Sequence, residues 1–528
     1  MQIGLFFSGA GGLIERTVDL KGLVRHFSAS FFVSSHNDFL NPEDLRDILD
    51  KVRQNHLEGV ILIGDSPLNY FNNRSADLLL KEIENQGINP NKLGFVNLKE
   101  QLALAHNASK QIMTQKASLL IQTEIERVKM SEPLDVISVA PRKSVAIIGA
   151  TAPGYVAAQQ LLQKGFTVYI IEQRDPAGLK AFGDDRLKPI VTFVKTHPKY
   201  NFYSNATVTD IYGYAGDYTL EIESLPKKDK LSVGVILMAN PKDIKLTRQI
   251  RAFLHIDVDE NEFFKPRNLD TLLAYTSEKG IFLAHNNYLD LGLIVAAADS
   301  AVLAITELLE RNEIKHVIAI SEIDSSLCGG CGTCVKTCMF HACTIDPIKK
   351  IAIIDPKRCK GCGSCVTACP TGARDLLTYP QKYLLKAIDI LSNFNAVDRK
   401  MLVFLCEGCG YRAMDAAATS GLQYPVGVLP LKVRCGGTID TQLILNAFSK
   451  GFDGVLICKC QDGHCSNITG NVDLDRRANL FREVLRSRGI NTEKLRIVDA
   501  LQEEQNKCII EINELYQDLV SEGGGECG

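Results

Sequence analysis

The spacing of the cysteines constrains this chain more than any other feature. All seventeen cysteines lie in the last 201 of its 528 residues. Eight of them form two runs of the same pattern, C-x2-C-x2-C-x3-C, which begin at Cys328 and Cys359. This repeated spacing is typical of a segment that wraps two cubane iron–sulfur clusters. The leading prediction is therefore electron transfer.

The ligands of the two predicted clusters should be crossed between the runs. In this motif three closely spaced thiolates hold one cluster, and the fourth cysteine of the run reaches the other cluster. One [4Fe–4S] cluster is therefore assigned to Cys328, Cys331, Cys334 and Cys369, and the other to Cys359, Cys362, Cys365 and Cys338. Two structural zinc sites are the alternative, but zinc ligands usually come as separated pairs. Cys343 lies outside the pattern and is expected to be a small buried side chain.

A second group of cysteines follows near the C-terminus. Its members are Cys406, Cys409, Cys435, Cys458, Cys460 and Cys465. They stand at or just after the ends of predicted strands, and in an open α/β sheet such ends meet at one crevice. Four thiolates from these loops could hold a two-iron cluster or a zinc ion, and spacing alone does not decide between the two.

A glycine-containing loop, GATAPG, follows the predicted strand 144–149 and resembles a dinucleotide-binding fingerprint. Gly149 and Gly154 match the fingerprint, and Glu172 ends the next strand, where it could bind a ribose hydroxyl. Thr151 stands where a glycine should let the backbone approach the pyrophosphate. The loop therefore predicts either a degenerate dinucleotide site or an ordinary βαβ unit.

Composition excludes several classes of partner. The chain is 45% hydrophobic and 23% charged, as in globular proteins, and its net charge of −3 gives no reason to expect nucleic acid or an anionic membrane. The first residues do not resemble a signal peptide. The apolar stretch 291–309 contains Asp299, so a buried helix explains it better than membrane insertion. We expect a cytoplasmic protein whose thiols bind metal rather than form disulfides.

The order of elements predicts a multidomain α/β fold. Apolar strands alternate with helices in three regions, including a helix that starts at Asn41 and Pro42. Residues 132–143 read as a linker, and the tail GGGECG as disordered. The predicted domains are an N-terminal α/β domain (1–135), a degenerate Rossmann-like domain (144–317), an inserted two-cluster ferredoxin domain (318–378) and a C-terminal open α/β domain (400–520).

The C-terminal domain resembles the delta subunit of methyl-viologen-reducing hydrogenase. The stretches that carry the resemblance are FLCEGCGYRAMDAA, LPLKVRCGGTID, ILNAFSKGFDGVLICKCQDGHCSNITGN and RANLFREVLRSRGI. The resemblance implies a [2Fe–2S] cluster that passes electrons between a hydrogenase and heterodisulfide reductase. Five cysteines of this chain match the family's pattern, although the cluster needs only four ligands, and Cys458 does not match it. The five are Cys406, Cys409, Cys435, Cys460 and Cys465.

Residues 1–400 resemble a trimmed A subunit of heterodisulfide reductase, the flavin and iron–sulfur subunit. The resemblance rests on NKLGFVNLKEQLALAH, VAIIGATAPGYVAAQQLLQKGFTVYIIE, HPKYNFYSNATVTDIYGYAGDYTLEIES, GIFLAHNN and the ferredoxin segment. The family's N-terminal cysteine segments correspond to GLFFSG and GDSPLNY, which have no thiols. The chain thus resembles a fusion of an A subunit with a delta subunit, which would fix the distance between their clusters.

The resemblance implies an electron-transfer subunit of a larger redox complex in an anaerobe, without substrate chemistry of its own. Its expected partners are heterodisulfide reductase B/C-like subunits, a hydrogenase, a formate dehydrogenase or a methylene-tetrahydrofolate reductase-like protein. In that family the flavin carries out electron bifurcation. Because Thr151 spoils the pyrophosphate loop, we expect FAD to be lost; the alternative is a flavin-containing reductase subunit that retains FAD.

Overall fold

The computed structural model divides the chain into two compact units. Unit 1 comprises Met1–Asp135, Ala319–Asp355 and Cys359–Gly528, and unit 2 comprises Val136–Ile318 and Pro356–Arg358. The residues that the structure describes are 1–39, 41–71, 82–173, 185–224, 226–239, 247, 250, 256, 264, 274–284, 290–318, 320–465, 467–489, 491–501 and 504–523. Of the tail predicted to be disordered, Gly523 ends a helix, and residues 524–528 lie outside the described residues.

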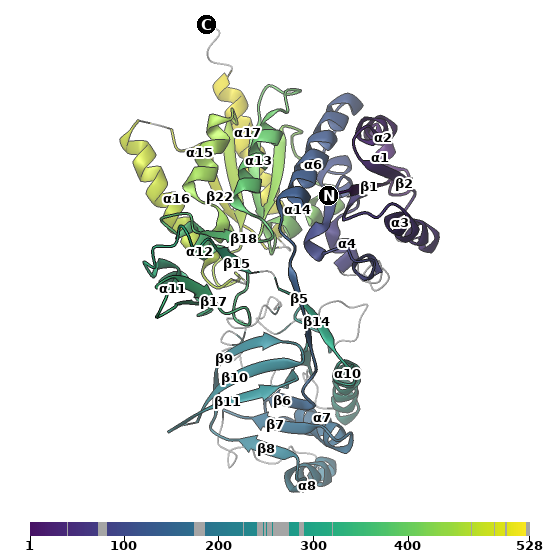
Figure 1. Ribbon diagram of the computed structural model, residues 1–528, viewed down its shortest axis with the longest axis vertical. Helices are drawn as coiled ribbons and strands as arrows, with labels where there is room; N and C mark the ends of the chain where they lie inside the picture. The colour runs from purple at the N-terminus through teal and green to yellow at the C-terminus, as the bar shows by residue number, and fades with distance from the viewer. Residues whose placement is uncertain are drawn as a thin grey trace. The chain divides into compact units, whose positions relative to one another are not determined.

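Unit 1 begins with a parallel four-stranded sheet in the order β2-β1-β3-β4, of which Figure 1 labels β1 and β2. Every residue of β1 and β3 is buried, as continuous apolar strands covered on both faces should be. The side chain of Asn41 caps α3 by accepting a hydrogen bond from the Glu43 amide. The elements are β1 (Ile3–Ser8), α1 (Leu13–Thr17), α2 (Leu20–Ser28), β2 (Phe32–His36), α3 (Pro42–Gln54), β3 (Gly59–Gly64), α4 (Pro67–Phe71), η1 (Pro90–Lys92), β4 (Leu93–Asn97), η2 (Lys99–Ala103) and α6 (Lys110–Met130).

The C-terminal part of unit 1 is a second parallel sheet in the order β20-β19-β21-β22. Helix α6 joins the two sheets, because it packs against β4 and also against α13. The buried ammonium of Lys116 on α6 donates to the carbonyl oxygens of Val426 and Val428. The elements are α13 (Gln381–Ser392), β19 (Met401–Cys406), α14 (Gly410–Thr419), β20 (Val428–Val433), η5 (Gly436–Thr438), α15 (Thr441–Ser449), β21 (Gly454–Lys459), α16 (Gly470–Ser487), β22 (Leu495–Asp499) and α17 (Gln505–Gly523).

The cysteine-rich segment of unit 1 has two similar halves. In each half a short helix starts one residue before the third cysteine and ends before the fourth. Two antiparallel strand pairs, β15–β18 and β16–β17, complete the segment. Its elements are β15 (Ser321–Ile323), α11 (Thr333–Thr337), β16 (Cys343–Ile345), β17 (Ala352–Ile354), α12 (Ser364–Thr367) and β18 (Arg374–Leu376). The small core of this segment consists largely of cysteine and aliphatic side chains.

Unit 2 is built on a parallel sheet in the order β13-β12-β6-β7-β8, with an antiparallel meander β11-β10-β9. The predicted linker 132–143 contains a strand, β5, which pairs with β14; apolar residues alternate too briefly there to reveal it. The elements are β5 (Asp135–Val139), β6 (Ser144–Ile148), α7 (Ala152–Gln163), β7 (Thr167–Ile171), η4 (Asp185–Leu187), α8 (Lys188–Thr196), β8 (Tyr200–Tyr203), β9 (Thr207–Tyr214), β10 (Asp217–Ser224), β11 (Lys227–Val233), β12 (Val235–Met238), β13 (Ile281–Leu283), α10 (Leu291–Leu309) and β14 (Ile314–Ile318). The predicted mixed α/β class is confirmed.

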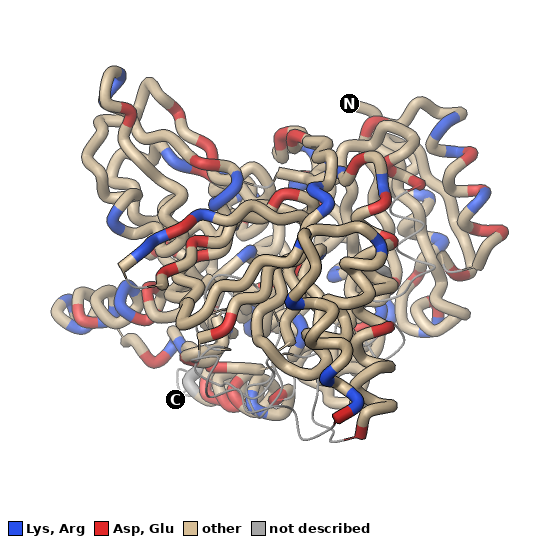
Figure 2. The backbone as a smooth tube through the Cα atoms, turned by 90° about the horizontal axis from the view of Figure 1, so that it is seen from below, with Lys and Arg blue, Asp and Glu red and all other residues tan. Residues whose placement is uncertain are grey.

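One helix of the described part, α10, is long and apolar enough to cross a membrane by length and composition. It packs against α7 and β13 and buries Ala298, Ala301 and Ile305 in the core of unit 2. A core helix passes the same test of length and composition. Figure 2 shows acidic and basic residues interspersed along the described chain.

Candidate iron–sulfur sites

The two cysteine runs adopt equivalent backbone conformations. Gly332 and Gly363 precede α11 and α12 at corresponding positions, with φ of 74° and 82°. This left-handed conformation favours glycine, and it turns the chain sharply between the second and third cysteines of each run. Gly363 also lies against the C-terminal sheet domain, because a Cβ atom there would come within 2.1 Å of the Thr438 methyl group.

The second predicted [4Fe–4S] set is brought together by the fold. The pKa of Cys362 is raised to about 12, mainly by burial and in smaller part by the nearby thiols of Cys365, Cys359 and Cys338. Burial also raises the pKa of Cys359, again with Cys338 among its neighbours. Cys338 of the first run therefore lies near the cysteines of the second run, and crossed ligation itself stays a prediction.

The first predicted set is partly gathered. Cys328 and Cys334 pack in the same small core. The Ala352 amide donates to the Cys328 sulfur at 3.4 Å, a contact typical of cluster ligands. Cys369 lies 3.6 Å from the Thr371 hydroxyl, and its place in this set stays a prediction.

Cys343 is buried as predicted, at 4% exposure. Its position among the ligands was not predicted: hydrogen bonds with the thiols of Cys338 and Cys365 raise the pKa of Cys343. The internal repeat could have drawn attention to Cys343. This residue lies five positions after Cys338, the last cysteine of its run, just as Arg374 lies five positions after Cys369.

Five cysteines meet at the carboxyl ends of β19, β20 and β21, three neighbouring strands. Cys460 is central: its thiol lies 3.6 Å from that of Cys406 and is hydrogen-bonded to those of Cys409 and Cys465. Cys435 lies against Cys465, whose pKa its thiol lowers. The thiols therefore form two pairs that meet at Cys460: Cys406 with Cys409, and Cys465 with Cys435. In the described part of the chain, no three His, Cys, Asp or Glu side chains are placed to hold a single metal ion.

Backbone amides and one arginine shape this C-terminal site. The Gly410 amide donates to the Cys406 sulfur at 3.3 Å, and the Gly437 amide to the Cys435 sulfur at 3.4 Å. Arg477 of α16 donates to the carbonyl oxygens of Gly437 and Ile439 and so holds the loop that follows Cys435. Amide donors to thiolate sulfur are the outer contacts that iron–sulfur ligands use, so the donor set fits a cluster.

Cys458 does not join the five. It points into the core between β21 and α17, where its sulfur lies 3.6 Å from that of Cys508, and both side chains are fully buried. The strand-end pattern had grouped Cys458 with the other five, and only the resemblance left it outside the ligand set; Cys508 was given no role.

The second ferredoxin half and the C-terminal site are neighbours within unit 1. The Thr367 hydroxyl donates to the Gly437 carbonyl oxygen at 3.0 Å. A Cβ atom on Gly437 would lie 2.7 Å from the Ser364 hydroxyl. Cys362 is also close enough to raise the pKa of Cys435, although the Cys465 thiol and burial contribute more. The two groups of thiols therefore lie side by side.

The glycine loop of unit 2 keeps part of its fingerprint. Gly149 has φ of 109°, and Gly154 packs so closely that a Cβ atom would lie 2.8 Å from the Gly149 carbonyl oxygen. Thr151 caps α7: its hydroxyl accepts from the Gly154 amide at 3.4 Å and donates to the Ala239 carbonyl oxygen. The buried Glu172 carboxylate accepts from the Ala150 amide at 2.8 Å. Because side chains of the chain itself bind these amides, the loop does not fit a pyrophosphate.

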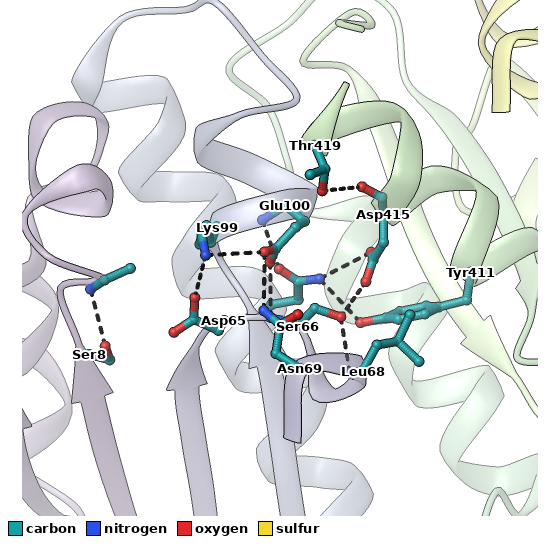
Figure 3. Close-up of polar contacts among 12 residues, drawn as sticks. Ser8, Asp65, Ser66, Leu68, Asn69, Lys99, Glu100, Tyr411, Asp415 and Thr419 are labelled. Atoms are coloured by element: carbon teal, nitrogen blue, oxygen red, sulfur yellow. Dashed lines mark hydrogen bonds and ion pairs between the residues drawn. The ribbon is translucent and has the colours of Figure 1, made fainter. Parts of the chain in front are cut away.

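The thiol-free segment GLFFSG covers most of β1 and the residue after it. The segment GDSPLNY begins at the last residue of β3, the strand next to β1. Figure 3 shows that Ser66 and its neighbours join a buried polar network with Asp415 of α14. Asn97 donates to the Asp415 carboxylate at 3.1 Å, and the Ser66 amide donates to Glu100 at 2.9 Å. Burial raises the pKa of Asp415 to about 7. At this edge of the N-terminal sheet, the polar side chains therefore bind one another and Asp415 through hydrogen bonds.

Family models match two parts of the chain. Residues 327–373 match the 4Fe-4S dicluster domain, and residues 401–522 match the delta subunit of methyl-viologen-reducing hydrogenase. Among curated proteins, the vhc iron-sulfur subunit of the F420-non-reducing hydrogenase from Methanococcus voltae is 32% identical over 124 residues, which cover 24% of this chain and 86% of that protein.

The A subunit of ferredoxin:CoB-CoM heterodisulfide reductase from Methanosarcina mazei is 28% identical over 264 residues. The match covers 50% of this chain and 33% of the relative, so the chain spans about a third of the length of that protein. Among solved structures, the GidA-related protein of Thermus thermophilus covers 32% of this chain and 99% of its own, with 12% identity and a TM-score of 0.24.

Both resemblances expected from the sequence are confirmed by these matches. Half of the chain is related to heterodisulfide reductase A subunits. Through residues 401–522, the chain belongs to the family of the methyl-viologen-reducing hydrogenase delta subunit.

Proposed function

We propose that this chain is an electron-transfer subunit of a multisubunit redox complex. Electrons would pass through two [4Fe–4S] clusters in the ferredoxin segment and one [2Fe–2S] cluster at the C-terminal sheet. The bound clusters supply the redox chemistry. The protein holds them through cysteine thiolates, donates backbone amides to the ligand sulfurs and keeps the sites at fixed distances.

The observation that carries this proposal is the contact between the second ferredoxin half and the C-terminal site. Ser364 and Thr367 pack on Gly437, two residues after Cys435, and Cys362 is close enough to raise the pKa of the Cys435 thiol. Cys343 and Arg374 link the first half to the second. The three groups of cysteines therefore form a continuous series within one compact unit, as an electron relay needs.

The names of the relatives support a role in a redox complex. They are subunits of heterodisulfide reductase and of F420-non-reducing hydrogenase. We propose a heterodisulfide reductase-like acceptor and, as donor, a hydrogenase, a formate dehydrogenase or a methylene-tetrahydrofolate reductase-like protein, in the cytoplasm of an anaerobe.

Anaerobic purification followed by metal and sulfide analysis tests the relay. Two cubanes and one two-iron cluster require about ten iron atoms per chain. About eight iron atoms with one zinc would support the ferredoxin clusters and overturn the two-iron cluster. EPR of the reduced protein should distinguish the two cluster types.

We propose further that unit 2 has lost its flavin, because Thr151 and Glu172 bind the backbone of the loop that would receive a pyrophosphate. Acid extraction of the anaerobically purified chain should release no stoichiometric flavin. About one flavin per chain would instead support a reductase subunit that retains FAD.

A further inference from the structure

The internal repeat of the ferredoxin segment places two unusual residues in equivalent positions. Cys343 and Arg374 each follow the last cysteine of their run, Cys338 and Cys369, by five residues. They are the first residues of β16 and β18. Both are buried, at 4% and 3% exposure. A thiol and a guanidinium therefore occupy the centre of a segment whose core is otherwise aliphatic side chains and ligand sulfurs.

The guanidinium of Arg374 contacts the predicted ligands directly. Its Nη2 donates to the sulfur of Cys334 at 3.3 Å. Cys365, a predicted ligand of the other cluster, and Cys343 also lie within its electrostatic reach. Arg374 therefore lies within reach of one predicted ligand of each [4Fe–4S] cluster.

Two donors of Arg374 lack protein acceptors. Its Nε and Nη1 atoms are fully buried and have no hydrogen-bond partner among the described residues. An unpaired buried guanidinium is costly, and guanidinium groups remain charged in proteins. A negatively charged cluster held by four thiolates would supply the missing acceptor and the missing counter-charge.

We propose that Arg374 sets the reduction potentials of the [4Fe–4S] clusters: its free N–H groups would donate to cluster sulfur, and its positive charge would lie near the predicted ligands of both clusters. Reduction adds one electron to a cluster and makes it more negative. A nearby cation and hydrogen bonds to sulfur stabilise that reduced form, so they raise its potential. Arg374 is a tuning residue, and this proposal rests on the proposed cluster content.

The test compares midpoint potentials of the full chain, purified anaerobically, by EPR-monitored redox titration. Arg374→Gln removes the charge and the fork of donors. Lys336→Gln, on the exposed surface of α11, removes the same charge from the same segment and is the matched control. Iron and sulfide are measured first, so that absence of clusters, which would overturn the proposed function, is distinguished from a failure of the Arg374 proposal.

Arg374→Gln is expected to lower the equilibrium constant for reducing the [4Fe–4S] clusters roughly tenfold. For a one-electron step this corresponds to a midpoint potential lower by about 59 mV. Lys336→Gln should leave them nearly unchanged. A fully loaded Arg374→Gln protein with the potentials of the control would overturn the proposal.

If the glutamine variant loses iron, a second measurement on the unaltered chain decides the question. In protein made with arginine labelled with 15N in the guanidinium group, pulsed EPR of the reduced clusters should detect coupling to that nitrogen. Loaded clusters without such coupling would overturn the proposal.

Discussion

The hydroxyl of Thr367 donates a hydrogen bond to the carbonyl oxygen of Gly437 across 3.0 Å. Thr367 lies between two predicted cluster ligands, Cys365 and Cys369, and Gly437 follows Cys435 by two residues. The same carbonyl oxygen accepts from Arg477, which also holds the loop from the other side. This hydrogen bond therefore joins the second half of the ferredoxin segment to the loop that follows Cys435.

Gly363→Ala should loosen this junction. A Cβ atom at Gly363 would lie 2.1 Å from the Thr438 methyl group, so the ferredoxin segment must shift away from the C-terminal site. The matched control is Gly332→Ala, at the equivalent position of the first half, because its φ is also positive but its Cβ would meet nothing within 4 Å.

Both substitutions should cost about 1–2 kcal/mol through backbone strain. Gly363→Ala should lose a further 1–3 kcal/mol, roughly, through the clash, and it should also alter the EPR signal of the C-terminal cluster. Anaerobic thermal unfolding and EPR of both variants provide the measurement. Equal losses in the two variants would show that the junction does not contribute to stability.

Cys369→Ser and Cys338→Ser test crossed ligation as a pair. Cys369→Ser should damage the cluster held by Cys328, Cys331 and Cys334, because the fourth cysteine of each run serves the other cluster. Cys338→Ser should damage the other cluster, since Cys338 lies with Cys359 and Cys362. Redox titration followed by EPR identifies which cluster changes, and the opposite assignment would refute crossing.

Cys435→Ser should remove about two iron atoms per chain and the [2Fe–2S] EPR signal while leaving both cubanes. Cys458→Ser is the control: this residue lies on β21 of the same sheet and is also buried, but its sulfur contacts Cys508. It should retain all the iron. Loss of the two-iron signal in Cys458→Ser, or its survival in Cys435→Ser, would contradict the ligand set proposed at the C-terminal sheet.

Local sequence patterns predicted much of the framework. The continuous apolar runs at 3–7, 59–64, 401–406 and 454–458 indicate strands, and β1, β3, β19 and β21 form there. Strands of a parallel sheet covered on both faces need no alternation. Asn41 and Pro42 located the start of α3. The positions after parallel strands predicted that six cysteines would converge, and the resemblance to the delta subunit left Cys458 out of that set. Such patterns depend on neighbours along the chain, so one sequence is enough to read them.

Contacts between distant segments were not predictable in the same way. Thr367 and Gly437 are 70 residues apart, and Ser66 and Asp415 are 349 apart. Their side chains are common types whose partners depend on how the sheets pack. Arg374 could have been noticed from the repeat, since aliphatic residues suit a buried strand start, but its contact with Cys334 required the fold.

The buried carboxyl of Asp415 should make stability depend on pH. Burial raises its pKa from 3.8 to about 7, so between these values the folded state binds the proton that the unfolded state has released. Proton binding to Asp415 therefore stabilises the folded state. This stabilisation is fully present below about pH 4 and is lost as pH rises through about 7. Between pH 6 and pH 8 this group should lower the free energy of unfolding by about 1 kcal/mol.

Asp415→Asn should remove that decline. An amide remains neutral and can still accept from Asn97 and Gln101, which both donate to the same carboxylate oxygen. The variant should therefore gain stability relative to the unaltered chain at pH 8 but not at pH 6, as measured by anaerobic thermal unfolding. Asp50→Asn, at an exposed position on α3, is the control and should keep the decline. The same decline in Asp415→Asn would show that another buried group, such as Glu100, titrates in its place.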